Sequence, residues 1–187
     1  MRILRSADYK RMPWKNGKGE TVEIAVFPPG ANVSDFDWRI SMATVADDGA
    51  FSVFDGIDRT LSVLTGDGMQ LSVEGRAAVL LKPSSAPYTF PGDVGTTAAL
   101  TSGVISDLNV MTRRGRFTHR VTRILASGET TLAAQGELTI AIAADEVRHD
   151  ADLLKSLDAI LLEKQDRPVA VHLDRETAIF LIEINPV

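Results

Sequence analysis

The sequence contains no cysteine, and this absence excludes several kinds of structure and chemistry. A disulfide framework, a thiolate metal site and a thiol nucleophile all require cysteine. Long hydrophobic runs are also missing, because nowhere do about 18 apolar residues follow one another. Charged residues and a proline interrupt the first residues, MRILRSADYKRMP, so they contain no apolar run of signal-peptide length. We therefore expect a soluble, cytoplasmic protein with no membrane partner.

A basic stripe is absent as well. The formal charge is -5 at pH 7, and acidic and basic residues are intermixed along the chain. Because nucleic-acid binding neutralises phosphates with clustered lysine and arginine, we expect no nucleic-acid partner. The 187 residues are nevertheless enough for a sizeable core, since a chain of this length buries roughly 70% of its extended surface.

Short strands separated by turn residues are what the sequence does contain. In DFDWRISMATV, apolar residues alternate with Asp37, Arg39 and Ser41, which predicts one strand with a polar face. The segment RTLSVLTGDGMQLSVEG predicts a tight hairpin at 66–68 with a residue at positive φ. Glycine or proline closes four further predicted strands, at 77–81, 88–90, 97–100 and 106–112. This spacing favours an all-β sandwich or barrel.

The second half continues the β pattern without a legible repeat. Strands are predicted at 119–126, 128–135, 137–144, 168–173 and 177–186, with polar breaks between them. Apolar residues at helical spacing, from Leu153 to Leu161, predict a short helical turn followed by a strand. No glycine- or proline-rich linker divides the halves near 113–118, so we expect one compact unit.

Familiar catalytic motifs are missing. His119, His149 and His172 are far apart in sequence and form neither an H-x-H pair nor an H-E-x-x-H helix, so we interpret them as three separate histidines. No G-x-S-x-G elbow occurs. The GKGE segment at 17–20 lacks the spacing of a phosphate-binding loop, and a strand follows it. We predict neither a metal nor a cofactor.

An unusual set of polar residues remains. The alternation of SDLNVMTRRG places Asp107, Asn109 and Arg113 on one strand face. Arg39 and Arg59 add forked donors that suit a carboxylate. If these side chains converge, they line a pocket for an anion; the alternative is a solvated face with surface ion pairs worth about 0–1 kcal/mol. Trp14 and Trp38 are either core aromatics or pocket walls.

Four segments together resemble one family. PWKNGKGETVEI (13–24), DFDWRISMATVADDGAFSVFDGIDRTLSVLTGDGMQL (35–71), FPGD (90–93) and DLNVMTRRGRF (107–117), in this order, resemble the cupin-like HutD/Ves proteins. The resemblance implies a bicupin, two small β-barrels in one chain, with halves at 1–113 and 114–187. Its motif positions imply these ligand-binding residues: Trp14, Lys15, Asn16, Arg39, Arg59, Asp107, Asn109 and Arg113. Where the family is expected to have NGGG, this chain has Asn16-Gly17-Lys18-Gly19. We expect Lys18 to alter how that loop approaches a ligand.

The family implies a role in regulating bacterial histidine utilisation by binding a small anionic metabolite, with urocanate and formylglutamate as candidate ligands. A second hypothesis is a metal-independent enzyme acting on a small acid, with Glu20, Asp107 or Lys15 as acid or base. A third is a β scaffold that acts through protein contacts, which would require an exposed apolar patch. Cupin-like sheets often pair through edge strands, so a homodimer is the expected assembly.

Overall fold

Strands form nearly all of the regular structure in the computed structural model, which describes residues 1–14 and 19–187. Within those two ranges the only helical element is the 3-10 helix η1 (Ser6–Asp8). The all-β prediction is therefore confirmed. Among the described residues, no helix has the length and hydropathy that a membrane span requires.

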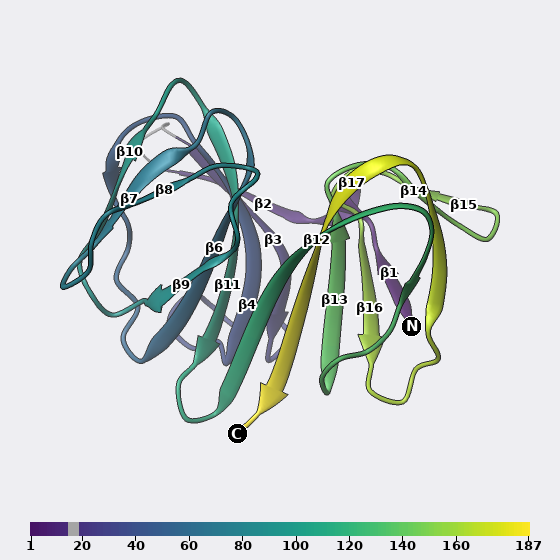
Figure 1. Cartoon of the computed structure of the whole chain (residues 1–187). Helices are drawn as coiled ribbons and strands as arrows, with labels where there is room; N and C mark the ends of the chain where they lie inside the picture. Colours follow the sequence, from purple (N-terminus) through teal and green to yellow (C-terminus); the bar gives the residue numbers. More distant parts are fainter. Residues whose placement is uncertain (15–18) are drawn as a thin grey trace. The chain divides into compact units, whose positions relative to one another are not determined.

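The chain divides into two compact units, and the first residues belong with the last. One unit comprises Lys10–Phe117, and the other joins Met1–Tyr9 to Thr118–Val187. The link is β1 (Arg2–Leu4), which pairs antiparallel with β16 (Ala159–Glu163) (Figure 1). No local sequence signal marked this pairing, because a three-residue strand carries almost no pattern of its own.

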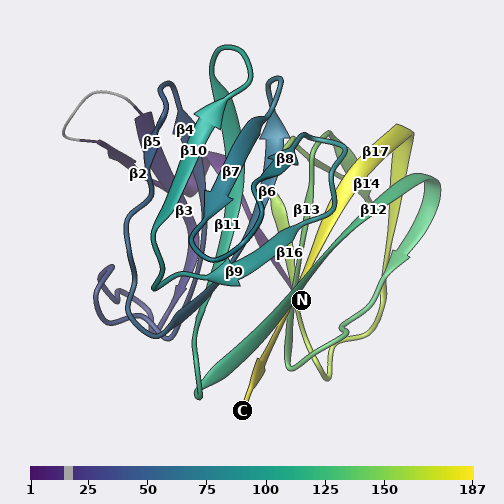
Figure 2. The same ribbon diagram turned by 60° about the vertical axis from the view of Figure 1, so that its left-hand side comes forward.

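The unit formed by residues 10–117 contains two sheets whose apolar faces share one core. The larger has the order β2 (Lys10–Pro13), β3 (Gly19–Phe27), β4 (Trp38–Val45), β11 (Ile105–Arg113), β6 (Ile57–Thr65) and β9 (Tyr88–Pro91). The smaller has the order β5 (Gly49–Ala50), β10 (Thr96–Leu100), β7 (Met69–Val73) and β8 (Val79–Leu81) (Figure 2). Leu61 and Val63 from the larger sheet pack with Met69 and Leu71 from the smaller, and all four are buried. Face-to-face packing of this kind leaves one interior between the sheets.

The turn at 66–68 corrects one prediction. Gly66 and Gly68 do have positive φ, at 89° and 103°, as the sequence predicts. However, β6 and β7 belong to different sheets, so the expected tight hairpin is wrong and the turn carries the chain from one sheet to the other. A Cβ at Gly68 would lie 2.3 Å from the Leu81 carbonyl oxygen. The two glycines therefore allow a close backbone approach as well as an unusual φ.

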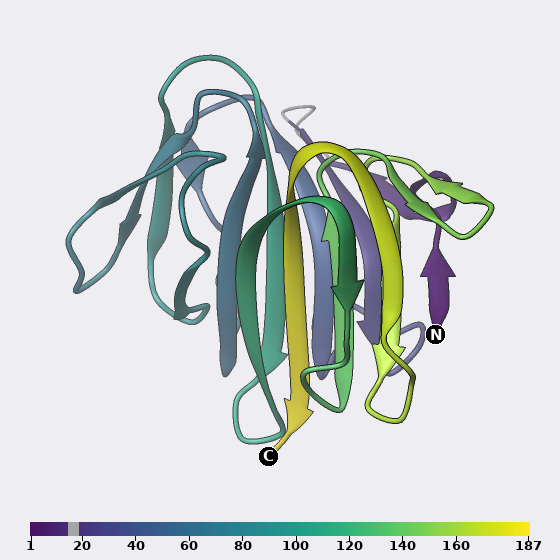
Figure 3. The same ribbon diagram turned by 45° about the vertical axis from the view of Figure 1, so that its right-hand side comes forward.

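The other unit is built around one curled sheet. Its strand order is β1, β16, β13 (Leu138–Ala143), β17 (Val169–Pro186), β14 (Val147–His149) and β15 (Asp152–Leu154), and β12 (Phe117–Leu132) also pairs with β17. Figure 3 shows the long strands β12 and β17 curling over along their length. Aliphatic side chains fill the interior, including Ile160, Leu162, Val171 and Ile179.

Two features of this unit differ from the sequence interpretation. The predicted breaks at 127 and at 174–176 lie inside the single strands β12 and β17, and Gly128, next to the first of them, has a φ of 66°. The predicted helical turn after Leu153 is also wrong. Residues 155–158 form a turn in which the Asp158 amide donates to the Lys155 carbonyl at 3.0 Å, and Leu157 has a φ of 67°. The predicted strand that follows is confirmed as β16.

Glycine at position 68 should be far less replaceable than glycine at position 75. Both have positive φ, but a Cβ at Gly75 meets nothing within 4 Å. Gly75→Ala should lower the free energy of unfolding by about 1–2 kcal/mol, the cost of a left-handed conformation for alanine. Gly68→Ala should lower it by at least about twice as much, because the backbone near Leu81 must also move. Urea denaturation of both variants measures the difference. Equal losses would contradict the close approach at Leu81.

Candidate functional site

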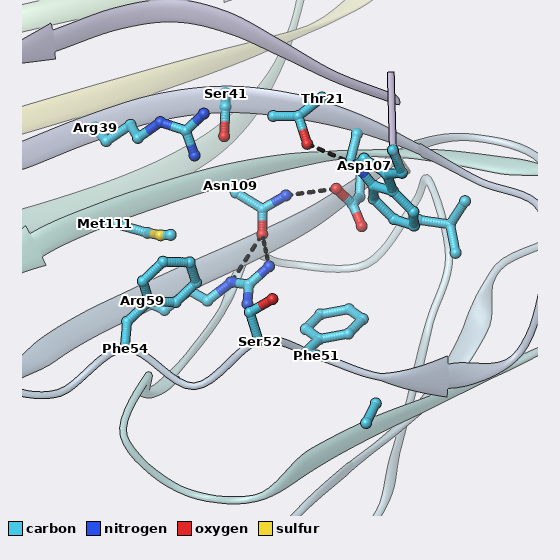
Figure 4. Close-up of a pocket in the computed structure, with 14 residues that line it drawn as sticks. Thr21, Arg39, Ser41, Phe51, Ser52, Phe54, Arg59, Asp107, Asn109 and Met111 are labelled. Atoms are coloured by element: carbon cyan, nitrogen blue, oxygen red, sulfur yellow. Dashed lines mark hydrogen bonds between the residues drawn. The ribbon is translucent and has the colours of Figure 1, made fainter. Parts of the chain in front are cut away.

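A cavity of about 440 Å³ lies inside the unit formed by residues 10–117. Its floor is the inner face of β4, β11 and β6, and the segment 50–54 supplies another wall (Figure 4). Its volume falls within the range typical of small-molecule sites, about 300–1,000 Å³. In contrast, the apolar hollow inside the other unit measures only about 10 Å³, so that interior is filled by side chains.

Strand register brings the polar residues of the cavity together. In the central strand β11, Met111 lies between Arg39 on β4 and Arg59 on β6. Two residues along, Asn109 lies opposite Ser41 on β4. Because side chains alternate across a strand, all of these residues point to the same face. The predicted polar face of β11 is thus present, but it is buried rather than solvated.

A chain of hydrogen bonds connects the buried charges. The Arg59 guanidinium donates to Asn109 Oδ1 from Nε at 2.9 Å and from Nη2 at 2.5 Å. Asn109 Nδ2 then donates to Asp107 Oδ1 at 2.5 Å. The Arg59 guanidinium also lies over the Phe51 ring, with 4.5 Å between its Cζ and the ring centroid. Asn109 therefore bridges the guanidinium of Arg59 and the carboxylate of Asp107 by hydrogen bonds, as Figure 4 shows.

Burial changes the acid–base properties of both charged ends. Desolvation raises the pKa of Asp107 to about 6, while the charge of Arg59 and hydrogen bonds from Asn109 and from the backbone at Ala43 oppose the rise. Desolvation likewise lowers the pKa of Arg59 to about 10, which leaves it charged at neutral pH. Asp107 is consequently a carboxyl group poised to change charge just below neutral pH.

Arg39 is held differently. Its Nε donates to Glu23 Oε2 at 2.7 Å, and both side chains are almost completely buried. Glu23 lies opposite Ser41, just before a β-bulge that shifts the register of β3 against β4. This pairing fixes the stem of Arg39 while its terminal nitrogens extend along the cavity floor (Figure 4). Such a fork is suited to a carboxylate.

The remaining predicted site residues are distributed as follows. Trp14 lines the cavity and its Nε1 donates to Thr21 Oγ1 at 2.9 Å. Lys15 and Asn16, with Lys18, lie outside the described residues. Arg113 is not among the lining residues, because its guanidinium donates to the Phe36 carbonyl oxygen at 2.7 and 3.1 Å.

Two further candidates from the sequence lie away from the cavity wall. Glu20 accepts a hydrogen bond from exposed Arg11 at 2.8 Å and does not line the cavity. Trp38 is on the opposite face of β4 from Arg39 and stacks on Phe27 at a centroid distance of 5.8 Å. The sequence left open whether each tryptophan is a core residue or a pocket wall. Trp14 is in the pocket wall, and Trp38 is in the core.

Sequence reasoning missed Glu23 and the aromatic residues Phe51 and Phe54. The two phenylalanines lie in the segment between β5 and β6 and line the cavity. Their signal was the apolar spacing of FSVF in a stretch without strand length, which suggests ring contacts from a loop. Glu23 gave no usable signal, since the bulge that sets its position is not visible in sequence.

The described residues contain no group of three or more histidines or carboxylates close enough to hold a metal ion. His149 Nδ1 contacts the Ala170 carbonyl oxygen, and His172 contacts Glu129. Both belong to the other unit, and neither is among the residues that line the cavity. The donor set of the cavity, arginine and amide with one carboxylate, suits an organic anion better than a cation.

This architecture, with two facing sheets enclosing a polar cavity in one unit and a curled sheet in the other, has the fold of cupin-like proteins. Escherichia coli YhhW matches with a TM-score of 0.69 at 8% identity, covering 100% of this chain and 98% of that one. A cupin 2 barrel domain protein from Leptotrichia buccalis matches with a TM-score of 0.57 at 10% identity, covering 97% and 98%. At these identities the likeness concerns the fold alone.

The chain belongs to the HutD family, whose model matches residues 6–181. The 21.2 kDa protein of the hutC 3′ region in Pseudomonas putida is 36% identical, over 92% of this chain and 97% of that protein. Protein Ves of Citrobacter koseri is 40% identical, over 72% and 71%. The structure of HutD from Pseudomonas fluorescens SBW25, in a formate condition, has a TM-score of 0.81 at 30% identity and covers 100% and 98%. The family resemblance is confirmed.

Asp107 should make stability fall as pH rises. Its folded pKa, about 6, is above its ordinary value of 3.8, so the folded state holds the proton more tightly and the contribution of Asp107 to stability is greatest below pH 4. Between pH 4.5 and 7.5 the wild type should lose about 2 kcal/mol relative to Asp107→Asn, at 1.36 kcal/mol per pKa unit. Urea denaturation at both pH values tests this. A pH-independent difference between the two proteins would contradict the burial of an ionisable Asp107.

Proposed function

We propose that this protein binds a small carboxylate metabolite in the cavity and has a regulatory role in histidine utilisation. The observation that carries the proposal is the placement of Arg39 and Arg59 on either side of Met111 on one buried floor. A charge-assisted hydrogen bond from a desolvated arginine contributes about 1.5–3 kcal/mol. Two such donors give useful affinity for a small acid.

The pathway is supported by the relatives rather than by the cavity. One relative is the protein of the hutC 3′ region, and a solved relative is HutD itself. Urocanate and formylglutamate are the candidate ligands, since both are carboxylates of a size that the cavity accommodates. The HutD structure obtained in a formate condition makes formate the smallest probe of the same chemistry.

We also propose that the two units are two cupin-like barrels, with Lys10–Phe117 forming the barrel that binds ligand. The filled interior of the other unit favours a structural role for it. A cytoplasmic location and a homodimer remain predictions.

A metal-independent enzyme is the second candidate, and one observation favours it. Asp107 has a pKa raised to about 6 and lines the cavity, which is the setting of a general acid or base. Under this alternative, overnight incubation converts the bound acid to product, and Asp107→Asn abolishes conversion while retaining binding. Mass spectrometry of each mixture distinguishes the candidates, because a binding protein returns the acid unchanged.

Calorimetric titration with urocanate, formylglutamate, histidine and formate tests the proposal. We expect saturable binding of a carboxylate, and a loss of about 10-fold or more in Arg39→Ala, from the charge-assisted bond that is removed. Arg148→Ala is the matched control, because Arg148 is an exposed arginine of the other unit that pairs with Asp174. Equal affinity in wild type and Arg39→Ala would remove Arg39 from the site.

A further inference from the structure

The cavity is balanced in charge before any ligand enters. Its charged lining residues, among those the structure describes, are Arg39 from β4, Arg59 from β6 and Asp107 from β11. Glu23 from β3 binds Arg39 and supplies the second negative charge. The described lining residues of the segment 50–54, together with Trp14 and Thr21, are uncharged.

An added anion disturbs this balance. Each arginine already has a carboxylate partner, directly for Arg39 and through Asn109 for Arg59. A ligand carboxylate that approaches Arg59 competes with Asp107 for the same positive charge. Two carboxylates near one desolvated cation cannot both remain ionised at low cost. One of the negative charges must be neutralised.

Asp107 is the group best placed to be neutralised. It is 1% exposed and lies in the same cavity, whereas the carboxylate of Glu23 receives a direct hydrogen bond from Arg39. A protonated Asp107 keeps one oxygen to accept from Asn109 and gains an O–H that can donate to a ligand oxygen. Its neighbours are therefore compatible with both charge states.

We propose that, given the carboxylate binding proposed above, the cavity takes up one proton with each anion and that Asp107 receives it. The proton comes from solvent when the ligand carries no N–H of its own to offer. By linkage, affinity for such an anion is greatest where Asp107 is already protonated and declines as pH rises. The raised pKa of free Asp107 supports this direction, because the proton is already held more tightly than by an exposed carboxyl group.

Formate is the probe, because it has no N–H group. Calorimetry at pH 7.5 in Tris and in triethanolamine, two amine buffers with different ionisation enthalpies, counts the protons bound. We expect about one proton per formate at pH 7.5, and an uptake that falls towards zero at pH 5. The dissociation constant should rise about tenfold per pH unit between pH 6.5 and 8. Tryptophan fluorescence also follows binding, because Trp14 lines the cavity.

Asp107→Asn imitates the protonated state, and we expect it to bind formate without proton uptake and with the same affinity at pH 6.5 and 8. Glu23→Gln is the matched control, since it removes the other carboxylate of the site. Proton uptake that persists in Asp107→Asn and vanishes in Glu23→Gln would overturn the assignment. The wild-type pH slope tests the proposal even if a variant fails to fold.

Two outcomes separate this inference from the proposed function. Formate binding with no buffer dependence and no pH slope would overturn proton uptake while leaving carboxylate binding in place. No binding of formate, urocanate, formylglutamate or histidine at any pH would overturn carboxylate binding itself, and the inference with it.

Discussion

Burial of Arg59 and Asp107 on one sheet face is the constraint on which the site depends. Asn109 connects the two groups, because it accepts hydrogen bonds from Arg59 and donates one to Asp107. Taking charged groups out of water costs several kcal/mol per ion unless other groups satisfy them. The protein is therefore less stable than it would be with aliphatic side chains on this buried face. Proteins keep such groups where they serve binding or chemistry, and the open space above them is consistent with binding.

The interiors of the two β units differ in whether buried arginines line a cavity. In one, strands β4, β6 and β11 place charged and amide side chains inward, and a cavity of about 440 Å³ remains. In the other, β13, β16 and β17 place aliphatic residues such as Ile160 and Val171 inward, and the interior closes. The two interiors therefore differ in the kind of side chain that their strands place inward.

Strand periodicity made the all-β fold and the polar face of β11 predictable. Side-chain chemistry singled out Arg39 and Arg59 as candidates, the family resemblance added Trp14, and all three line the cavity. Sequence could not show that β6 and β7 enter different sheets, because pairing depends on partners distant in the chain. The sequence could not distinguish a solvated polar face from a buried one, because polar and apolar residues alternate in the same way along both kinds of strand. Arg113 shares the alternation of Asp107 but binds the Phe36 carbonyl oxygen instead. The alternation alone therefore cannot show that Arg113 lies outside the cavity lining.

A crystal structure grown with urocanate would test the central claim most directly. The account predicts planar density in the cavity, with the carboxylate within about 3 Å of the guanidinium nitrogens of Arg39 or Arg59. Urocanate bound elsewhere on the protein, with only water in contact with these arginines, would contradict it.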